Sequence, residues 1–257
     1  MQLTVLGCWA PYPRPGEACS GYLLRAGDTT VMLEAGNGSF AELARHVDFR
    51  RLSGLVITHF HPDHYADVFC LRHAIEGARR ADEMNGPVKL FIPPDPADIY
   101  AKLASYTGAF DVVNVEELPE TTQIPGVITR KALLNDLALY FIHTAHSLPG
   151  YAVLFLQKDK TVFFSGDTAP TEAIERAAQG AGLFLCEASG LDKDAGYLAN
   201  AHMTAREAGT LARRAGAKRL VITHFWPEYA VTDLLNEAGR SFGGAVEAAK
   251  QGKTYIL

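Results

Sequence analysis

The chain of 257 residues has few cysteines, and their spacing narrows the kinds of site they can form. The four cysteines are Cys8, Cys19, Cys70 and Cys186, and no two of them have C-x-x-C spacing. This argues against a disulfide framework and against a zinc site made of cysteines. Cys70 and Cys186 lie in apolar runs, so we predict that both are small residues of the core.

Long apolar runs and a basic leader are also missing. No segment approaches the roughly 18 consecutive apolar residues of a membrane span. The start of the chain, Met-Gln-Leu-Thr-Val-Leu-Gly, lacks the basic and apolar regions of a signal peptide, and it reads as a first strand. We therefore expect a cytoplasmic protein that does not enter a membrane.

Positive charge is not in excess, since the formal net charge is −5. This balance provides no global attraction to phosphate, although a local basic patch could still bind nucleic acid. No linker or low-complexity segment divides the chain. We therefore predict one domain over residues 1–257.

What the chain does have is a dense cluster of imidazoles and carboxylates. The apolar run at 55–58 ends in His59, His61, Asp63 and His64, with the spacing H-x-H-x-D-H. In an extended segment His59 and His61 point the same way, and the proline at position 62 forces a turn that can swing Asp63 and His64 into a second cluster. These side chains are poor core material but good ligands for borderline metals. The stretch therefore predicts metal binding.

The same rule, a polar residue just past an apolar strand, finds three further candidates: His146, Asp167 and His224. The seven candidates are more than one tetrahedral zinc ion uses, whereas two metals that share a carboxylate would use them all. Two metals roughly 3.5–4 Å apart can hold both the attacking and the leaving oxygen of a displacement at phosphorus. A hydroxide between them would form near neutral pH.

Strands and helices alternate along the chain. Apolar patterns predict strands at 2–8, 20–26, 29–34, 51–58, 88–92, 110–115, 152–157, 161–165, 183–187 and 219–223, and a hairpin at 128–143 that turns at Asn135 and Asp136. Helical spacing predicts helices at 40–47, 66–83, 97–106, 171–178 and 204–215. Capping boxes are expected where Ser39 precedes Glu42 and where Thr204 precedes Glu207.

One hexapeptide occurs twice: Leu-Val-Ile-Thr-His-Phe stands at 55–60 and again at 220–225. Both copies read as buried strands that end in a histidine. The repeat suggests two β/α halves whose equivalent strands deliver ligands to one central seam. Together with the alternating elements, it favours an α/β protein with two sheets packed face to face and helices outside.

These motifs occur in the order of a known family. H-x-H-x-D-H, a later histidine, Gly-Asp-Thr at 166–168 and Thr-His-Phe at 223–225 resemble the metallo-β-lactamase-fold hydrolases. The stretch Ala-His-Met-Thr-Ala-x-Glu-Ala at 201–208 is similar to the ribonuclease Z-like phosphodiesterase branch. The resemblance covers essentially the whole chain. It implies an αββα four-layer sandwich with two mixed sheets flanked by helices and a dinuclear metal site.

The resemblance also implies roles for single residues. His59, His61 and His146 would bind one metal, Asp63, His64 and His224 the other, and Asp167 would bridge them. Asp63 would also orient or deprotonate the attacking water, and His202 would donate a proton to the leaving oxygen. Glu187 would hold His202, or it is only a satisfied carboxylate at a strand end.

The substrate is narrowed by a departure from ribonuclease Z, which carries a long tRNA-clamping arm between the positions of His146 and Asp167. Here one hairpin fills that interval, so full tRNA binding is not expected. We expect a hydrolase with two divalent metals, zinc or else manganese, that cuts small, cyclic or single-stranded nucleotide phosphodiesters. The branch also suggests a homodimer.

Two other functions stay open from the sequence. The same dinuclear site could hydrolyse lactones, carboxyl esters or thioesters, and His202 would then be dispensable. The chain could also be a non-catalytic nucleotide-binding module, although a retired site would be free to lose some of its ligands.

Overall fold

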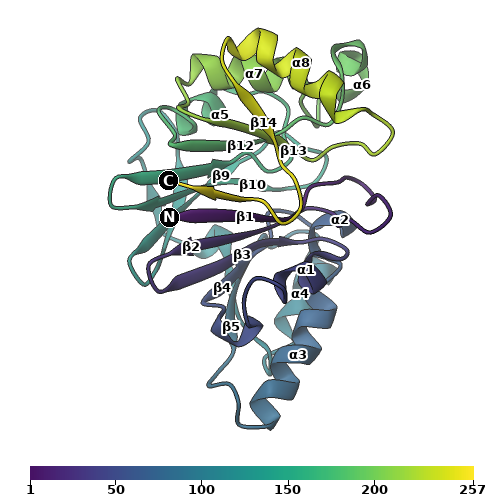
Figure 1. Cartoon of the computed structure of the whole chain (residues 1–257). Helices are drawn as coiled ribbons and strands as arrows, with labels where there is room; N and C mark the ends of the chain where they lie inside the picture. Colours follow the sequence, from purple (N-terminus) through teal and green to yellow (C-terminus); the bar gives the residue numbers. More distant parts are fainter. The chain divides into compact units, whose positions relative to one another are not determined.

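The computed structural model describes residues 1–257, and the chain divides into two compact units. Unit 1 comprises residues 1–118 and 250–256, and unit 2 comprises residues 119–249 with residue 257. Each unit holds one β-sheet and its own helices (Figure 1). Whether the two units form the predicted single domain over 1–257 stays a prediction.

The sheet of unit 1 has seven strands in the order β15-β1-β2-β3-β4-β5-β6. Strands β15, β1, β2 and β3 pair antiparallel, whereas β3 to β6 run parallel, so the sheet is mixed. The strand from the far end of the chain, β15, lies beside β1 (Figure 1). The bounds are β1 Gln2–Gly7, β2 Gly21–Ala26, β3 Thr29–Ala35, β4 Gly54–Val56, β5 Val88–Ile92, β6 Phe110–Asn114 and β15 Thr254–Ile256.

Unit 1 has four α-helices, of which α3 buries an apolar face. They are α1 Ser39–Leu43, α2 Pro62–Tyr65, α3 Val68–Arg80 and α4 Ala97–Ala104, with short 3-10 helices at Phe49–Arg51 and Val115–Glu117. The buried face of α3 consists of the four residues whose spacing predicted the helix: Val68, Leu71, Ile75 and Ala78. Three of them join strand residues such as Leu55 and Leu90 in one core cluster, and each buried aliphatic side chain contributes about 1.5–3 kcal/mol.

The sheet of unit 2 has eight strands in the order β14-β13-β12-β11-β10-β9-β8-β7, and it is also mixed. Its strands are β7 Glu120–Thr121, β8 Thr129–Leu134, β9 Leu137–His143, β10 Tyr151–Gln157, β11 Lys160–Phe164, β12 Leu183–Glu187, β13 Leu220–Thr223 and β14 Val246–Ala248. Its helices are α5 Glu172–Ala177, α6 Ala195–Leu198, α7 Ala205–Arg214 and α8 Val231–Phe242, with a 3-10 helix at Asp192–Asp194.

The repeated hexapeptide forms an interior parallel strand in each unit. Strand β4 lies between β3 and β5, and β13 lies between β12 and β14, and both strands are fully buried. The predicted α/β class, with two mixed sheets flanked by helices, is confirmed. Thr204 and Glu207 form the predicted capping box at the start of α7.

Other local predictions are wrong for local reasons. Gly38, in a left-handed conformation, takes the N-cap of α1, so Ser39 forms no capping box; Glu42 instead bonds the ring of His46 at 2.9 Å. The strand predicted at 51–58 is limited to Gly54–Val56, because a 3-10 helix capped by the Asp48 side chain occupies the segment before it.

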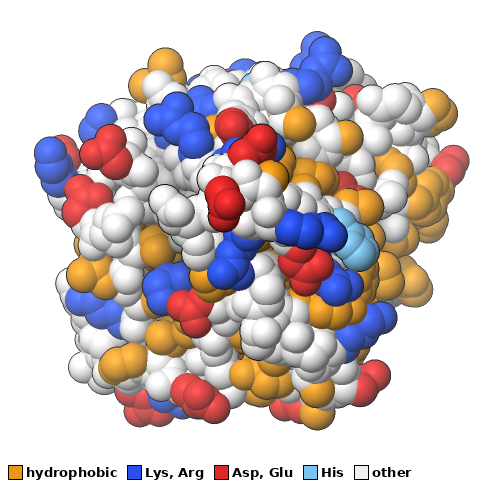
Figure 2. Space-filling model, turned by 90° about the horizontal axis from the view of Figure 1, so that it is seen from below, with side chains coloured by type: hydrophobic (Ala, Val, Ile, Leu, Met, Phe, Trp, Pro, Cys, Tyr) orange, Lys and Arg blue, Asp and Glu red, His pale blue; other side chains and the backbone are white.

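Cys70 is exposed, contrary to the prediction of a core residue, because it lies on α3 outside the buried face. The other three cysteines are buried. None of the helices combines the length and the apolar character needed to cross a membrane. On the face shown in Figure 2, Lys and Arg side chains are interspersed with Asp and Glu, so this face presents no block of one charge.

Gly209 permits the close packing of α7 against α8, and its replacement should destabilise unit 2. A Cβ atom at this position would lie 2.3 Å from the carbonyl oxygen of Ala238 and 2.3 Å from the hydroxyl of Ser241. We predict that Gly209→Ala lowers the free energy of unfolding by about 1–3 kcal/mol, measured by denaturant unfolding.

The matched control is Gly239→Ala within α8, where a Cβ atom meets nothing within 4 Å. This change should raise the free energy of unfolding by up to about 1 kcal/mol, because alanine favours the helix. Equal stabilisation by both substitutions would contradict the close approach of the two helices.

The four thiols should differ sharply in reactivity. Burial raises the pKa of Cys8 and of Cys19 to about 12 each, and it raises the pKa of Cys186 well above its usual value. Because the thiolate is the reactive form, we predict that only Cys70 reacts quickly with a water-soluble aromatic disulfide at pH 8. Cys70→Ser should remove the fast phase, and unfolding should expose the other thiols. A second fast thiol in the folded protein would refute the prediction.

Candidate metal centre

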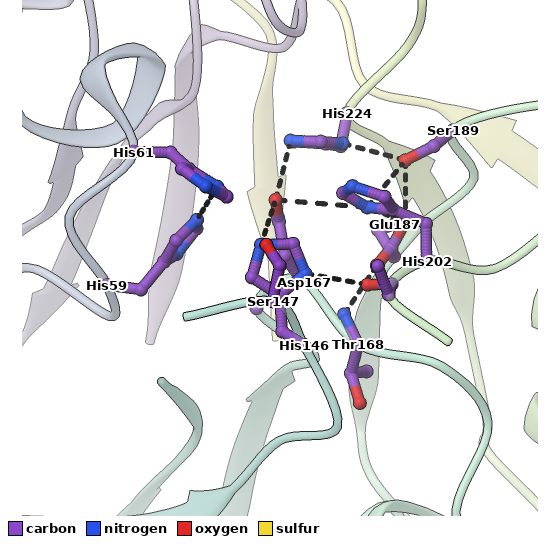
Figure 3. A network of polar contacts seen from close by, with 12 residues as sticks. His59, His61, His146, Ser147, Asp167, Thr168, Glu187, Ser189, His202 and His224 are labelled. Atoms are coloured by element: carbon purple, nitrogen blue, oxygen red, sulfur yellow. Dashed lines mark hydrogen bonds and ion pairs between the residues drawn. The ribbon is translucent and has the colours of Figure 1, made fainter. Parts of the chain in front are cut away.

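In unit 1 the H-x-H-x-D-H motif begins just past β4. The Nε2 atom of His59 lies 3.1 Å from the Nδ1 atom of His61, and the two rings point toward each other (Figure 3). The Nδ1 atom of His59 lies 3.2 Å from the hydroxyl of Thr58. The two imidazoles therefore bring one ring nitrogen each to the same point, as two ligands of one ion must.

The turn at Pro62 gathers the rest of the motif. Pro62 opens α2, which carries Asp63 and His64. The Nε2 atom of His64 lies 3.5 Å from an Asp63 carboxylate oxygen, and its ring centroid lies 4.2 Å from that of His59. The turn brings Asp63 and His64 beside each other, but it also places His64 against His59, so within unit 1 the predicted second cluster is continuous with the first.

A glycine after β3 allows α2 to approach the sheet. A Cβ atom on Gly36 would lie 2.0 Å from the carbonyl oxygen of Asp63, so any larger residue would displace α2. The backbone of Asp63 can come this close only because position 36 has no side chain.

Glu34 belongs to the same cluster, and the sequence reasoning missed it. It lies near the end of β3 with no solvent exposure, and its carboxylate accepts a hydrogen bond from the backbone N–H of Thr58 at 3.2 Å. Its other oxygen lies 3.6 Å from the Nδ1 atom of His64. The available signal was an acidic residue inside the apolar run Val-Met-Leu-Glu-Ala. Such a residue needs a polar partner when it is buried.

In unit 2 the central group is Asp167, which follows β11. Gly166 before it adopts a positive φ of 58°, and a Cβ atom there would lie 2.6 Å from the carbonyl oxygen of Tyr151. The Oδ2 atom of Asp167 lies 3.1 Å from Nε2 of His224 and 3.9 Å from Nε2 of His146. One carboxylate oxygen therefore faces two imidazoles (Figure 3).

His146 is held by two neighbouring segments. Its Nδ1–H donates to the carbonyl oxygen of Ala201 at 2.7 Å, so Nε2 is left to face Asp167. The residue before it, Ala145, donates its N–H to the Thr168 hydroxyl at 3.1 Å. The Gly-Asp-Thr turn therefore positions both Asp167 and the loop that carries His146.

His224 follows β13 in an uncommon backbone conformation. Its φ of 62° lies in the left-handed region, which costs a non-glycine residue about 1–3 kcal/mol. Its Nδ1 atom lies 2.8 Å from the Ser189 hydroxyl, and its Nε2 atom faces Asp167. The strained backbone and the serine contact together aim the imidazole at the carboxylate.

Glu187, at the end of β12, contacts His202 as predicted. Its carboxylate has no solvent exposure and accepts from the backbone N–H of Thr168 at 2.6 Å and of Met203 at 3.2 Å. Its Oε2 atom also accepts from the Ser189 hydroxyl at 2.6 Å and lies 3.2 Å from Nδ1 of His202. The alternative reading, a satisfied carboxylate without a link to His202, does not describe this geometry.

His146 and His202 in unit 2 differ in proton affinity. Burial lowers the pKa of His146 below its usual value, in spite of the opposing charge of Asp167. Burial would also lower the pKa of His202, but the charge and hydrogen bond of Glu187, together with Asp167, outweigh it and raise that pKa. His202 is therefore the better proton donor of the two, and His146 the better neutral ligand.

The donor set of each unit fits divalent metal ions. Two ligands about 2.1 Å from one tetrahedral ion lie about 3.4 Å apart, close to the separations of 3.1 Å in the pair His59–His61 and 3.1–3.9 Å around Asp167. The possible ligand atoms of Asp167, His202 and His224 lie within 4.8 Å of one another. His202 differs from the other two histidines because its Nδ1 faces the carboxylate of Glu187, which favours the protonated ring over a neutral ligand. The division of the seven candidates between two metals draws on both units and stays a prediction.

Comparison with known proteins establishes the family. A family model described as the beta-lactamase superfamily domain matches residues 29–225, which is more than half of the chain. The protein therefore belongs to the beta-lactamase superfamily. Family membership and the His/Asp clusters together confirm the coarser prediction of a metallo-hydrolase with the metallo-β-lactamase fold.

Individual relatives match along the whole chain. The probable metallo-hydrolase YhfI of Bacillus subtilis is 28% identical over 256 residues, with 98% of each chain covered. The ribonuclease Z of Myxococcus xanthus is 27% identical, with 100% of this chain and 98% of that protein covered. The crystal structure of YhfI superposes with a TM-score of 0.89 at 24% identity, covering 99% of this chain and 98% of YhfI. The crystal structure of human short-form tRNase Z superposes with a TM-score of 0.75 at 20% identity, covering 100% of this chain and 99% of that chain. The two superpositions confirm the fold.

The link between Glu187 and His202 can be tested in the metal-free protein. We predict that the imidazole pKa of His202, followed by NMR, lies above 6.5, and that Glu187→Gln lowers it because a charge and a charge-assisted hydrogen bond are lost. A raised histidine pKa adds stability below about pH 6.5, and this contribution is lost as pH rises through the folded pKa. Glu175→Gln, a carboxylate away from His202, is the control. An unchanged pKa in Glu187→Gln would contradict the assignment.

Proposed function

We propose that the clusters of the two units together bind two divalent metal ions. In this proposal His59, His61 and His146 hold one ion, Asp63, His64 and His224 hold the other, and Asp167 bridges the two. The ligand atoms are imidazole nitrogens and carboxylate oxygens without a thiolate, which suits zinc, with manganese as the alternative. When bound, such ions would lower the pKa of water and offset the charge of a phosphodiester.

We propose further that the reaction is phosphodiester hydrolysis. Water adds to phosphorus, the bond between phosphorus and the ester oxygen breaks, and the leaving oxygen takes a proton. The observation that carries this proposal is the pair His202–Glu187 beside Asp167. Glu187 keeps one ring nitrogen of His202 engaged and raises its pKa, so the other nitrogen can deliver a proton near neutral pH.

Asp63 has the second catalytic role in this proposal. It lies in the first turn of α2, with a carboxylate oxygen 3.5 Å from His64. There it would orient the attacking water or take its proton, while His202 serves the leaving group. Two groups of opposite proton preference are what hydrolysis with a poor leaving group requires.

The length of one connection supports the proposed substrate class. Strands β10 and β11, which lie between His146 and Asp167, form a hairpin joined only by Lys158 and Asp159. No arm that could clamp a folded RNA extends from this interval. The ribonuclease Z of Myxococcus xanthus is a relative along the whole chain, which supports phosphodiester chemistry. We propose small, cyclic or single-stranded nucleotide diesters as substrates.

The role of His202 can be tested with substrates that differ in the leaving group. We predict that His202→Ala slows metal-reconstituted enzyme about 10²–10⁴-fold on diesters that release a nucleoside alkoxide. The loss should be much smaller on p-nitrophenyl diesters, because nitrophenolate leaves without a proton. Steady-state rates on both substrates measure the difference.

Metal content is the control in this experiment, since His202→Ala should bind as much metal as the wild-type protein. An equal loss on both classes of diester would contradict proton donation by His202. Metal-reconstituted protein that hydrolyses lactones or thioesters but no phosphodiester would refute the proposed reaction itself. Tight nucleotide binding without turnover would favour a binding module instead.

A further inference from the structure

The hydroxyl group of Ser189 contacts three functional side chains of unit 2. Its hydroxyl oxygen lies 2.6 Å from Oε2 of Glu187, 2.8 Å from Nδ1 of His224 and 3.4 Å from Nδ1 of His202 (Figure 3). One hydroxyl group therefore contacts a buried carboxylate and two imidazoles. The group is half-buried, so solvent competes little for these contacts.

The backbone around Ser189 is fixed on both sides. The N–H of Ser189 donates to the carbonyl oxygen of Met203 at 3.0 Å, and the N–H of Ala188 donates to Thr223 at 2.8 Å. The carbonyl oxygen of Gly190 accepts from Ala205 at 2.8 Å. The hydroxyl is thus held between the strand that ends in His224 and the segment that carries His202.

Counting protons decides the direction of each hydrogen bond. A serine hydroxyl has one proton, and it is donated to Glu187, whose carboxylate only accepts. Toward His224 the hydroxyl oxygen can then only accept, so the proton of the neutral imidazole must sit on Nδ1. The Nε2 atom of this tautomer turns its lone pair toward Asp167, whose carboxylate also only accepts, so the arrangement needs a cation between the two groups.

We infer that Ser189 is a positioning residue that locks His224 in the tautomer protonated on Nδ1. This inference rests on the proposed function in one respect, because a metal would bind the lone pair on Nε2. The neutral imidazole in water favours the opposite tautomer, with the proton on Nε2, which cannot ligate a metal through that atom. The hydrogen bond made by the second ring nitrogen selects the tautomer of a ligating histidine and sets its orientation.

Through Ser189, the charge of Glu187 also strengthens the hydrogen bond that His224 donates. Because its proton is held by the carboxylate, the hydroxyl oxygen is a stronger acceptor than that of a serine bonded to water. Glu187 therefore engages His202 directly and His224 through one hydroxyl. The same carboxylate orients a predicted acid and a predicted ligand.

The direct test is the tautomer of His224 in metal-free protein that carries Asp167→Ala, because the Asp167 carboxylate would otherwise compete for a proton on Nε2. In protein labelled with 15N in its histidines, at a pH where the imidazoles are neutral, ring nitrogen shifts distinguish the two tautomers. His224→Ala identifies the signals. In this background we expect Nδ1–H with Ser189 and with Ser189→Thr, and a shift to Nε2–H or to a mixture in Ser189→Ala. Ser189→Val has the shape of the threonine variant but no hydroxyl group, and it should behave like Ser189→Ala. Agreement between the valine and alanine variants shows that the result does not come from a folding defect in one of them.

A second measurement concerns metal affinity, read by competition with a chromophoric chelator for Zn²⁺. Ser189→Ala should bind at least one zinc ion about 10–100-fold more weakly, and Ser189→Thr should bind as the wild type does. Ser105→Ala, an exposed serine on a helix end, is the control and should change neither readout.

The outcomes separate this inference from the proposed function. An unchanged Nδ1–H tautomer in both Ser189→Ala and Ser189→Val would overturn the role of Ser189, whatever metal is bound. An Nδ1–H tautomer that is lost in those two variants, together with wild-type protein that binds no zinc, would support Ser189 and refute the metal centre. Weaker zinc binding in Ser189→Ala and Ser189→Val, with wild-type binding in Ser189→Thr, would support both the role of Ser189 and the metal centre.

Discussion

The carboxylate of Glu187 lies in unit 2 with no solvent exposure, where an uncompensated charge would cost several kcal/mol. Four donors surround it: two backbone N–H groups, the Ser189 hydroxyl and the ring of His202. The donors come from the turn after β11, from the end of β12 itself and from the segment before α7. Because each segment must be in place to satisfy the carboxylate, this one charge ties together the loops that carry Asp167 and His202.

Unit 1 also contains a buried carboxylate that contacts a backbone N–H and an imidazole. Glu34, near the end of β3, is equally buried, accepts from the backbone N–H of Thr58 and faces His64. In each unit a buried glutamate from the strand beside the repeated hexapeptide bonds a backbone N–H next to a predicted ligand. The repeated hexapeptide is thus accompanied in each unit by a buried glutamate on the neighbouring strand.

Features that depend on residue type and on the spacing of apolar residues could be predicted from the sequence. Features that depend on contacts between distant residues could not. Side chains at the ends of apolar strands, and the buried face of α3, follow from local patterns. The cap at Ser39 failed because a left-handed Gly38 took its place, and β14 and β15, of three residues each, are too short to show a period. Glu34 and Ser189 act on groups 24 and 35 residues away, and no local pattern encodes that proximity.

The three histidines near Asp167 differ in what holds their Nδ1 atoms. A backbone carbonyl oxygen holds His146, a hydroxyl holds His224 and a carboxylate holds His202. A neutral acceptor fixes the ring without stabilising a second proton, whereas a carboxylate favours the doubly protonated cation. The difference sorts the imidazoles by chemistry: His146 and His224 are prepared to present a lone pair, and His202 is prepared to hold a proton. A phosphodiesterase of the proposed kind needs both kinds of histidine side by side, and the acceptor behind each ring is what distinguishes them.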